Sequence, residues 1–219
     1  MTTRTIGGAA LPQGALAVWR GFVGAAAVTL CYQLVHWSHI VDQRILPSAV
    51  LRLTFDPAYL RAAFDTVAPA LTGLALACAL AIPLGLLLGM APLVNRISRG
   101  LIDILRSLPG TALIPVFIIT LGAGDMMKTA LVVYVTAWPI LFNTVYGVLS
   151  VDKVAIESAR SCRVNGLALW RRVVLPSAAP FIATGVRYAL PISVVIVIAA
   201  ELITGSESGI GGYLLLQQS

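Results

Sequence analysis

The longest polar interruption in the C-terminal half of the chain is the stretch Ser150–Pro176, SVDKVAIESARSCRVNGLALWRRVVLP. Ser150 is predicted to cap a first short helix, because a serine side chain accepts a hydrogen bond from a free N–H group of the first turn. Asn165 and Gly166 favour the left-handed backbone that ends a helix and turns the chain. A second short helix then runs towards Pro176. The stretch therefore predicts a helix-turn-helix between two apolar segments.

The composition predicts an all-α integral membrane protein. Of the 219 residues, 58% are hydrophobic and 11% are charged, and the mean hydropathy is +0.92. Soluble proteins have roughly 45–50% apolar and about 25% charged residues. The net charge of +6 is carried by clusters between apolar segments, and these clusters do not form a continuous basic face with stacking aromatics. We therefore expect no nucleic-acid partner and interpret the basic residues as topology determinants.

Several apolar segments are long enough to cross a hydrocarbon core of about 30 Å, which requires about 20 helical residues. The predicted spans are Ala15–Trp37, Ala68–Val94, Leu101–Leu121, Thr129–Leu149 and Ala178–Leu202, with a polar connector at Ser38–Asp65, a short loop at Asn95–Gly100 and the start of a sixth span at Tyr213. We expect the native chain to continue beyond that start with roughly 20 more apolar residues. This pattern predicts two parts. Residues 1–67 hold the first span and an external connector, and residues 68–219 hold the membrane core.

The distribution of basic residues predicts the orientation. One side of the membrane collects Arg4, Arg20, Arg96, Arg99, Lys153, Arg160, Arg163, Arg171 and Arg172, and the other side collects Arg44, Arg52, Arg61 and Lys128. Loops rich in lysine and arginine stay in the cytoplasm. The N-terminus and the stretch Ser150–Pro176 are therefore expected to be cytoplasmic.

Charged residues inside the predicted spans are candidates for function, since such residues normally face a bundle interior or water. Asp103 and Arg106 lie three residues apart, so they share a helical face and can pair. They either line a translocation path or form a structural pair. Arg187 lies deep in the fifth span and either steers an anionic solute or braces the helices. Glu201, at the outer end of that span, has either a partner-facing or an interfacial role.

No catalytic or metal site is expected. The chain has no His-Glu-x-x-His, no Gly-x-Ser-x-Gly and no Walker-type glycine loop. His36 and His39 lack a third ligand, and Cys31, Cys78 and Cys162 are far apart. The chain is therefore predicted not to be an enzyme, and any energy source belongs to a separate subunit.

Several motifs together resemble the permease subunits of ABC importers, most closely those of the sulfonate, taurine and nitrate type. The family's "EAA" loop is matched by Glu157, Ser158 and Ala159, then Gly166, and a closing Leu175 and Pro176. Residues 106–122 resemble the family's third span and residues 200–213 its fifth-to-sixth junction, so the resemblance covers about residues 64–219. The family usually has glycine where Arg163 stands. We therefore expect the turn at Asn165 and Gly166, and the Arg163 side chain to point towards an acidic spot on the partner or towards lipid phosphates.

The resemblance implies a type I importer bundle in a bacterial inner membrane, which moves a small polar, anionic solute inward by alternating access. It implies a cytoplasmic ABC ATPase dimer that binds ATP and Mg²⁺, a second permease subunit, identical or related, and an extracytoplasmic solute-binding protein. No cofactor is expected on this chain. The residues implied in ATPase coupling are Glu157, Ser158, Ala159, Arg163, Gly166, Leu167, Trp170, Leu175 and Pro176. The apolar stripe of Leu167, Trp170 and Val174 either docks the ATPase or packs on the ends of the spans.

The charged residues within the spans also allow an alternative function. Asp103, Arg106 and Arg187 would then form the polar site of an intramembrane enzyme or assembly factor.

Overall fold

The computed structural model of the chain describes residues 19, 23–24, 26–28, 30–31 and 56–218. Most of the predicted first span, Ala15–Trp37, and most of the connector, Ser38–Asp65, lie outside the described residues. The chain divides into two units, Met1–Asp56 and Pro57–Ser219.

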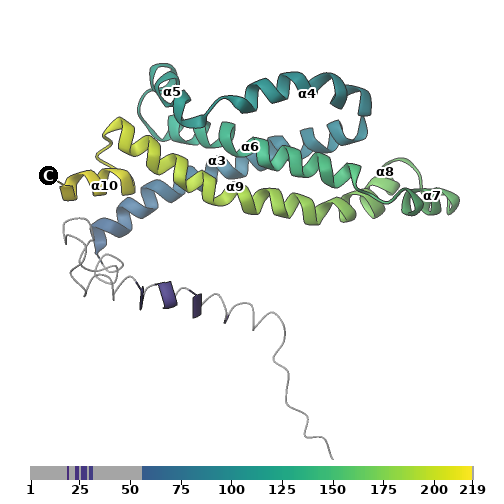
Figure 1. Cartoon of the computed structure of the whole chain (residues 1–219), viewed down its shortest axis with the longest axis horizontal. Coiled ribbons are helices and arrows are strands. Elements are labelled where there is room, and N and C mark those ends of the chain that lie inside the picture. The colour runs from purple at the N-terminus through teal and green to yellow at the C-terminus, as the bar shows by residue number, and fades with distance from the viewer. Residues whose placement is uncertain (1–18, 20–22, 25, 29, 32–55, 219) are drawn as a thin grey trace, which may run out of the picture. The chain divides into compact units, whose positions relative to one another are not determined.

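The second unit is built from helices, and no strand occurs among the described residues, which confirms the all-α class (Figure 1). Its elements are α3 (Pro57–Met90), α4 (Pro92–Ser107), η1 (Gly110–Leu113), α5 (Ile114–Leu121), α6 (Asp125–Leu149), α7 (Lys153–Ser161), α8 (Gly166–Leu169), η2 (Trp170–Val174), α9 (Leu175–Thr204) and α10 (Gly209–Gln218). Three described helices are long and apolar enough to span a membrane, or four if the bent pair of α4 and α5 counts as one span.

Helices α3, α6 and α9 form the centre of the unit. Two glycines, Gly85 and Gly89, lie where α3 meets α6. A Cβ atom at Gly89 would stand 2.6 Å from the Cβ of Val148, and one at Gly85 would stand 2.7 Å from the Cβ of Thr144. This Gly-x-x-x-Gly spacing is typical of membrane helices whose backbones approach closely. The fit between α3 and α6 therefore depends on the absence of side chains at these two positions.

The starts of α3 and α4 differ from the sequence prediction. Helix α3 starts at Pro57, so the last part of the predicted connector is helical. Proline favours the first position of a helix, where its missing N–H group costs nothing, and Ala62 is already buried in this first part. The short loop predicted at Asn95–Gly100 is also wrong. Those residues belong to α4, which starts at Pro92 for the same reason.

The predicted third span, Leu101–Leu121, is broken in two. The helical pieces before and after residues 108–109 meet at an angle of 76°. Leu108 is extended, with φ −71° and ψ 120°, because the ring of Pro109 disfavours helical geometry in the residue before it. The break separates α4 from α5.

The predicted sixth helix is present and begins earlier than expected. Helix α10 starts at Gly209, and not at Tyr213. Figure 1 shows α10 at the opposite end of the helical bundle from α7.

Candidate functional site

The loop after α6 begins differently from the prediction. Ser150 is the C-cap of α6, and its hydroxyl donates to the carbonyl oxygen of Gly147 at 3.0 Å. The N-cap of α7 is Asp152, whose Oδ1 accepts a hydrogen bond of 2.9 Å from the N–H of Val154. The assignment of Ser150 as the cap is therefore wrong. A carboxylate at this position satisfies a free N–H group and also complements the positive end of the helix dipole.

Helix α7 ends at a left-handed residue, and that residue is Arg163, with φ +60°. The N–H of Arg163 donates to Arg160 O at 2.9 Å, and the N–H of Val164 donates to Ala159 O at 3.0 Å. These two bonds make a Schellman motif, in which glycine is the usual left-handed residue. Arg163 is the one described non-glycine residue with positive φ.

The predicted turn at Asn165 and Gly166 is thus only half right. Asn165 is extended, with φ −127° and ψ 169°, and forms the N-cap of α8. Gly166 has φ +55°, so it does take the left-handed geometry. Arg163 ends the first helix and Gly166 starts the second. The loop therefore uses two left-handed residues where one was expected.

After the turn the helix continues without a break from Gly166 to Thr204, over 39 residues. Trp170–Val174 forms a π-helical turn, in which the N–H of Leu175 donates to Trp170 O. Pro176 has no N–H group and cannot bond to the carbonyl four residues earlier, which favours a local change of helix type at this point.

Most residues of α7 are exposed. Glu157 and Ser158 are exposed, and Ala159 is partly buried. Within the described part of the chain, the Glu157 carboxylate makes no hydrogen bond or ion pair. The apolar stripe divides, because Val174 is buried whereas Leu167 is 84% exposed. Packing on the spans therefore accounts for Val174 but not for Leu167.

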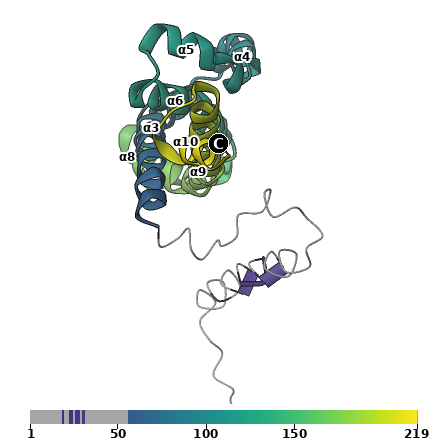
Figure 2. The same ribbon diagram turned by 90° about the vertical axis from the view of Figure 1, so that its left-hand side faces the viewer.

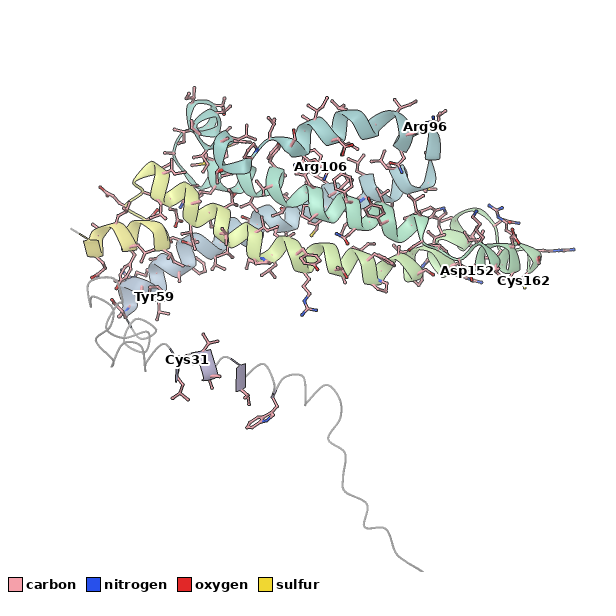
Figure 3. The ribbon with its side chains drawn as sticks, in the orientation of Figure 1. Cys31, Tyr59, Arg96, Arg106, Asp152 and Cys162 are labelled. Atoms are coloured by element: carbon pink, nitrogen blue, oxygen red, sulfur yellow. The ribbon has the colours of Figure 1, made fainter. Side chains whose placement is uncertain are left out.

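The pairing predicted for Asp103 and Arg106 is confirmed. The Nε atom of Arg106 lies 2.8 Å from Oδ1 of Asp103, and the guanidinium lies over the ring of Phe142 at 5.1 Å. Figure 3 shows Arg106 on the side of α4 that faces α6. The opposite side of α4 is apolar and exposed, with Leu93, Ile97, Leu101 and Ile104. The amphipathic helix α4 therefore turns its polar face towards the bundle.

Two cavities lie along this polar face, and Arg106 lines both. The first, of about 400 Å³, is also lined by Asn95, Asp103 and Tyr146. The second, of about 420 Å³, lies at the break between α4 and α5 and is also lined by Pro109, Tyr134 and Trp138. Broken membrane helices that line a cavity are a common way of building a solute site in transporters.

Comparison with known proteins places this arrangement in a family. Residues 81–218 match the profile of the family described as "Binding-protein-dependent transport system inner membrane component". The chain belongs to this family. The match includes residues 81–90 of α3, helix α4, the loop between α6 and α9, and α10. The resemblance inferred from the loop motif is therefore confirmed.

Individual relatives of this chain are also named as permeases. It is 36% identical over 146 residues, 67% of the chain and 54% of the relative, to a putative ABC transporter permease of Methanocaldococcus jannaschii. It is 41% identical over 110 residues, 50% of the chain and 41% of the relative, to the putative aliphatic sulfonates transport permease SsuC of Escherichia coli. It is 33% identical over 130 residues, 59% of the chain and 47% of the relative, to the taurine transport system permease TauC of the same organism. The chain spans about half the length of the curated relatives it matches.

The third charged candidate in the permease spans lies apart from the other two. Arg187 is exposed on α9 and lines neither of the cavities that Arg106 lines. In both Figure 1 and Figure 2, α4 and α9 lie on opposite sides of α6. Asp103, Arg106 and Arg187 therefore do not form one site. The alternative of an intramembrane enzyme or assembly factor built on these three residues is not favoured.

The structure contains a buried polar cluster around Glu201 that the sequence did not predict. Glu201 is fully buried, so neither the partner-facing nor the interfacial role predicted for it applies. Its carboxylate accepts hydrogen bonds from Thr66 Oγ1 at 3.0 Å and from the N–H of Gly211 at 2.9 Å, and it pairs with Lys128. The N–H of Ile210 donates to Thr66 Oγ1 at 2.8 Å. The cluster therefore caps the start of α10 and ties it to α3, α6 and α9.

One sequence signal pointed to this cluster. Glu201 stands at the end of an apolar span, and a carboxylate in such a place requires partners. Its partners could not be identified from local spacing. No group of three histidine, cysteine, aspartate or glutamate side chains suited to a metal ion occurs among the described residues.

Proposed function

We propose that the chain is the transmembrane subunit of an ABC importer, which moves a small polar solute inward by alternating access driven by a separate ATPase. The observation that carries this proposal is α7, which presents Glu157 exposed and unpaired within the family's loop motif. An exposed acid on a short cytoplasmic helix offers a partner with basic residues a charge-assisted hydrogen bond.

The ATPase subunits and this chain have different roles in the proposed complex. Two cytoplasmic ABC ATPase subunits bind ATP and Mg²⁺, and their closure moves α7 and the turn at Arg163. The chain itself is a pore-forming subunit and not an enzyme. The proposed docking surface is α7 and the turn that follows it. The residues implied in coupling that belong to this surface are Glu157, Ser158, Ala159 and Arg163. Gly166, Leu167 and Trp170 connect that surface to α9, which begins with Leu175 and Pro176.

The solute path is assigned to the polar face of α4. Asp103 and Arg106 line cavities of about 400 and 420 Å³ at a helix break, whereas Arg187 lines neither. An arginine in this position favours an anionic solute, which agrees with the sulfonates named for one relative and the bicarbonate named for another, a permease of Synechocystis that is 28% identical over 142 residues. Arg187 is assigned to bracing or to contact with a neighbouring subunit.

Membership of the family supports the remaining proposed partners. A second permease subunit, identical or related, completes the pore, and an extracytoplasmic binding protein delivers the solute. The distribution of lysine and arginine supports a cytoplasmic N-terminus and loop in a bacterial inner membrane. Residues 1–67 then hold the first span and the external connector, and residues 68–219 hold the permease core.

Co-purification of an ATPase with Glu157 variants tests the proposal. The full chain is expressed with an ABC ATPase subunit and a solute-binding protein from the same organism, and Glu157→Ala is expected to reduce both the ATPase captured and solute uptake. Glu207→Ala is the matched control, because Glu207 is an exposed acid in the loop at the other end of α9. Membrane insertion should be unchanged in both. A full complement of ATPase and normal uptake with Glu157→Ala would contradict the assignment.

A further inference from the structure

An apolar groove runs between the end of α3 and the segment that follows the cytoplasmic turn. It has a volume of about 800 Å³, and its lining includes Leu87 and Met90 from α3 and Leu167, Trp170 and Arg171 from α8 and η2. Leu87 is 61% exposed and Leu167 is 84% exposed. Apart from Arg171, the groove is lined by apolar side chains and one glycine.

The position of the groove relative to the bilayer follows from charge. No charged residue occurs between Thr66 and Asn95, so the end of α3 belongs to the apolar layer. At this edge of the layer, the first charged residue after α3 is Arg96. The segment that leads into α9 carries Arg171 and Arg172. The groove therefore opens at the cytoplasmic edge of the hydrocarbon core, where phospholipid phosphates lie.

Arg171 stands at the rim of the groove as an available cation. It is exposed, and it makes no hydrogen bond or ion pair within the described part of the chain. A guanidinium group can donate two parallel hydrogen bonds to a phosphate. An apolar groove with one free arginine at its rim matches a molecule with an apolar tail and an anionic head.

We propose that this groove binds one anionic phospholipid, with an acyl chain along Leu87, Met90 and Leu167 and the phosphate on Arg171. This site is separate from the proposed docking of the ATPase on α7. The bound lipid contacts both a membrane-spanning helix and the segment that follows the coupling turn. Movement of the turn would then change the lipid site, so transport by the complex would depend on anionic lipid.

Arg172 provides a matched control, because it is also exposed but does not line the groove. Trp170 provides a reporter inside it. Replacing Trp19, Trp37 and Trp138 by phenylalanine in the full chain leaves Trp170 as the single tryptophan. Its fluorescence is then quenched by phospholipids whose acyl chains carry bromine near the headgroup.

The experiment compares brominated phosphatidylglycerol with brominated phosphatidylcholine in bilayer nanodiscs. We expect Trp170 to be quenched by both, with a preference for phosphatidylglycerol of about fivefold, the size expected for one arginine beside an anionic headgroup. Arg171→Gln should abolish the preference, and Arg172→Gln should keep it. Equal quenching by the two lipids in the parent chain would overturn the proposal. So would an absence of quenching, which would show that protein, from a second copy of this chain or from another part of the same chain, covers the groove.

Native mass spectrometry of the unmodified chain gives an independent measurement if the tryptophan variants fail to fold. One retained phosphatidylglycerol should be lost with Arg171→Gln and kept with Arg172→Gln, and retention in both variants would overturn the proposal. Neither measurement uses the ATPase. Failure of the lipid site therefore leaves the capture of ATPase by Glu157 as a separate question, and the reverse also holds.

Discussion

The Nζ atom of Lys128 lies 3.0 Å from Oε1 of Glu201, with 4% and 0% of the two side chains exposed. The pair joins α6 to α9, and the carboxylate also accepts hydrogen bonds from α3 and α10. Removing two charges from water is costly, and their attraction offsets that cost only when the remaining polar atoms are also bonded. The hydrogen bonds from Thr66 and Gly211 meet this requirement. The pair therefore acts as the centre of a four-helix junction.

Lys128→Met is expected to leave a buried carboxylate without its cation and to lower the free energy of unfolding by about 3–5 kcal/mol. Adding Glu201→Gln to that variant should restore part of the loss, since the unpaired charge is then gone. Thermal unfolding of the two single variants and the double variant in detergent measures the coupling. Additive losses in the double variant would show that the two residues do not act as a pair.

Arg163→Gly is expected to stabilise the end of α7 by about 1 kcal/mol, because a side chain in left-handed geometry costs roughly 1–2 kcal/mol. Arg160→Gly is the control, since glycine inside the last turn should destabilise the helix by about 1 kcal/mol. Hydrogen exchange of the α7 amides measures both effects locally. Slower exchange in Arg163→Gly and faster exchange in Arg160→Gly is the expected pair of results, and no change in the first would argue against strain at Arg163.

Gly166→Val should weaken the loop. Gly166 has φ +55°, and a β-branched residue is strained in that region. No atom stands near a Cβ at this position, so any loss would come from the backbone and not from a clash. The expected result is reduced capture of the ATPase with normal membrane insertion. Unchanged capture would show that the turn tolerates another geometry.

Gly89→Ala is expected to destabilise the bundle by about 1–3 kcal/mol, because the added methyl group would overlap Val148. Gly100→Ala is the matched control. Gly100 lies in α4 with no atom near its Cβ position, and alanine is favoured over glycine in a helix by about 0.5–1 kcal/mol. The midpoint of thermal unfolding should therefore fall in Gly89→Ala and rise in Gly100→Ala. A loss in Gly100→Ala as large as in Gly89→Ala would refute the close approach of α3 and α6.

Arg106→Gln is expected to raise the KM of solute uptake by about tenfold, as loss of about 1.4 kcal/mol of binding would produce. Arg187→Gln should leave the KM unchanged, since Arg187 lines neither cavity. Uptake into proteoliposomes that contain the whole complex measures both. The opposite result would move the solute path from the polar face of α4 to the exposed side of α9.

Local sequence features were sufficient for part of this structure. The pairing of Asp103 with Arg106 was predictable because residues three apart share a helical face. The sequence shows the broken third span only as charged residues and Pro109 within an apolar run. It does not predict the angle between the two helical pieces. The sequence predicts the end of α7 at Asn165 and Gly166, but the left-handed residue that ends the helix is Arg163. The hydrogen bonds of Arg163 and Val164 with the preceding turn outweigh the poor preference of arginine for left-handed geometry.

The sequence by itself determined the class of protein, most of the long apolar helices and the loop motif, since hydropathy, helical period and motif spacing are properties of neighbouring residues. The tertiary structure alone decided which polar residues meet. Thr66 and Lys128 lie 135 and 73 positions from Glu201 and are brought to it only when α3, α6 and α9 pack together. It also decided that Arg106 and Arg187 face different sides of α6. The physical reason is that a buried charge is stabilised by atoms close to it in space, and those atoms come from segments far apart in the chain.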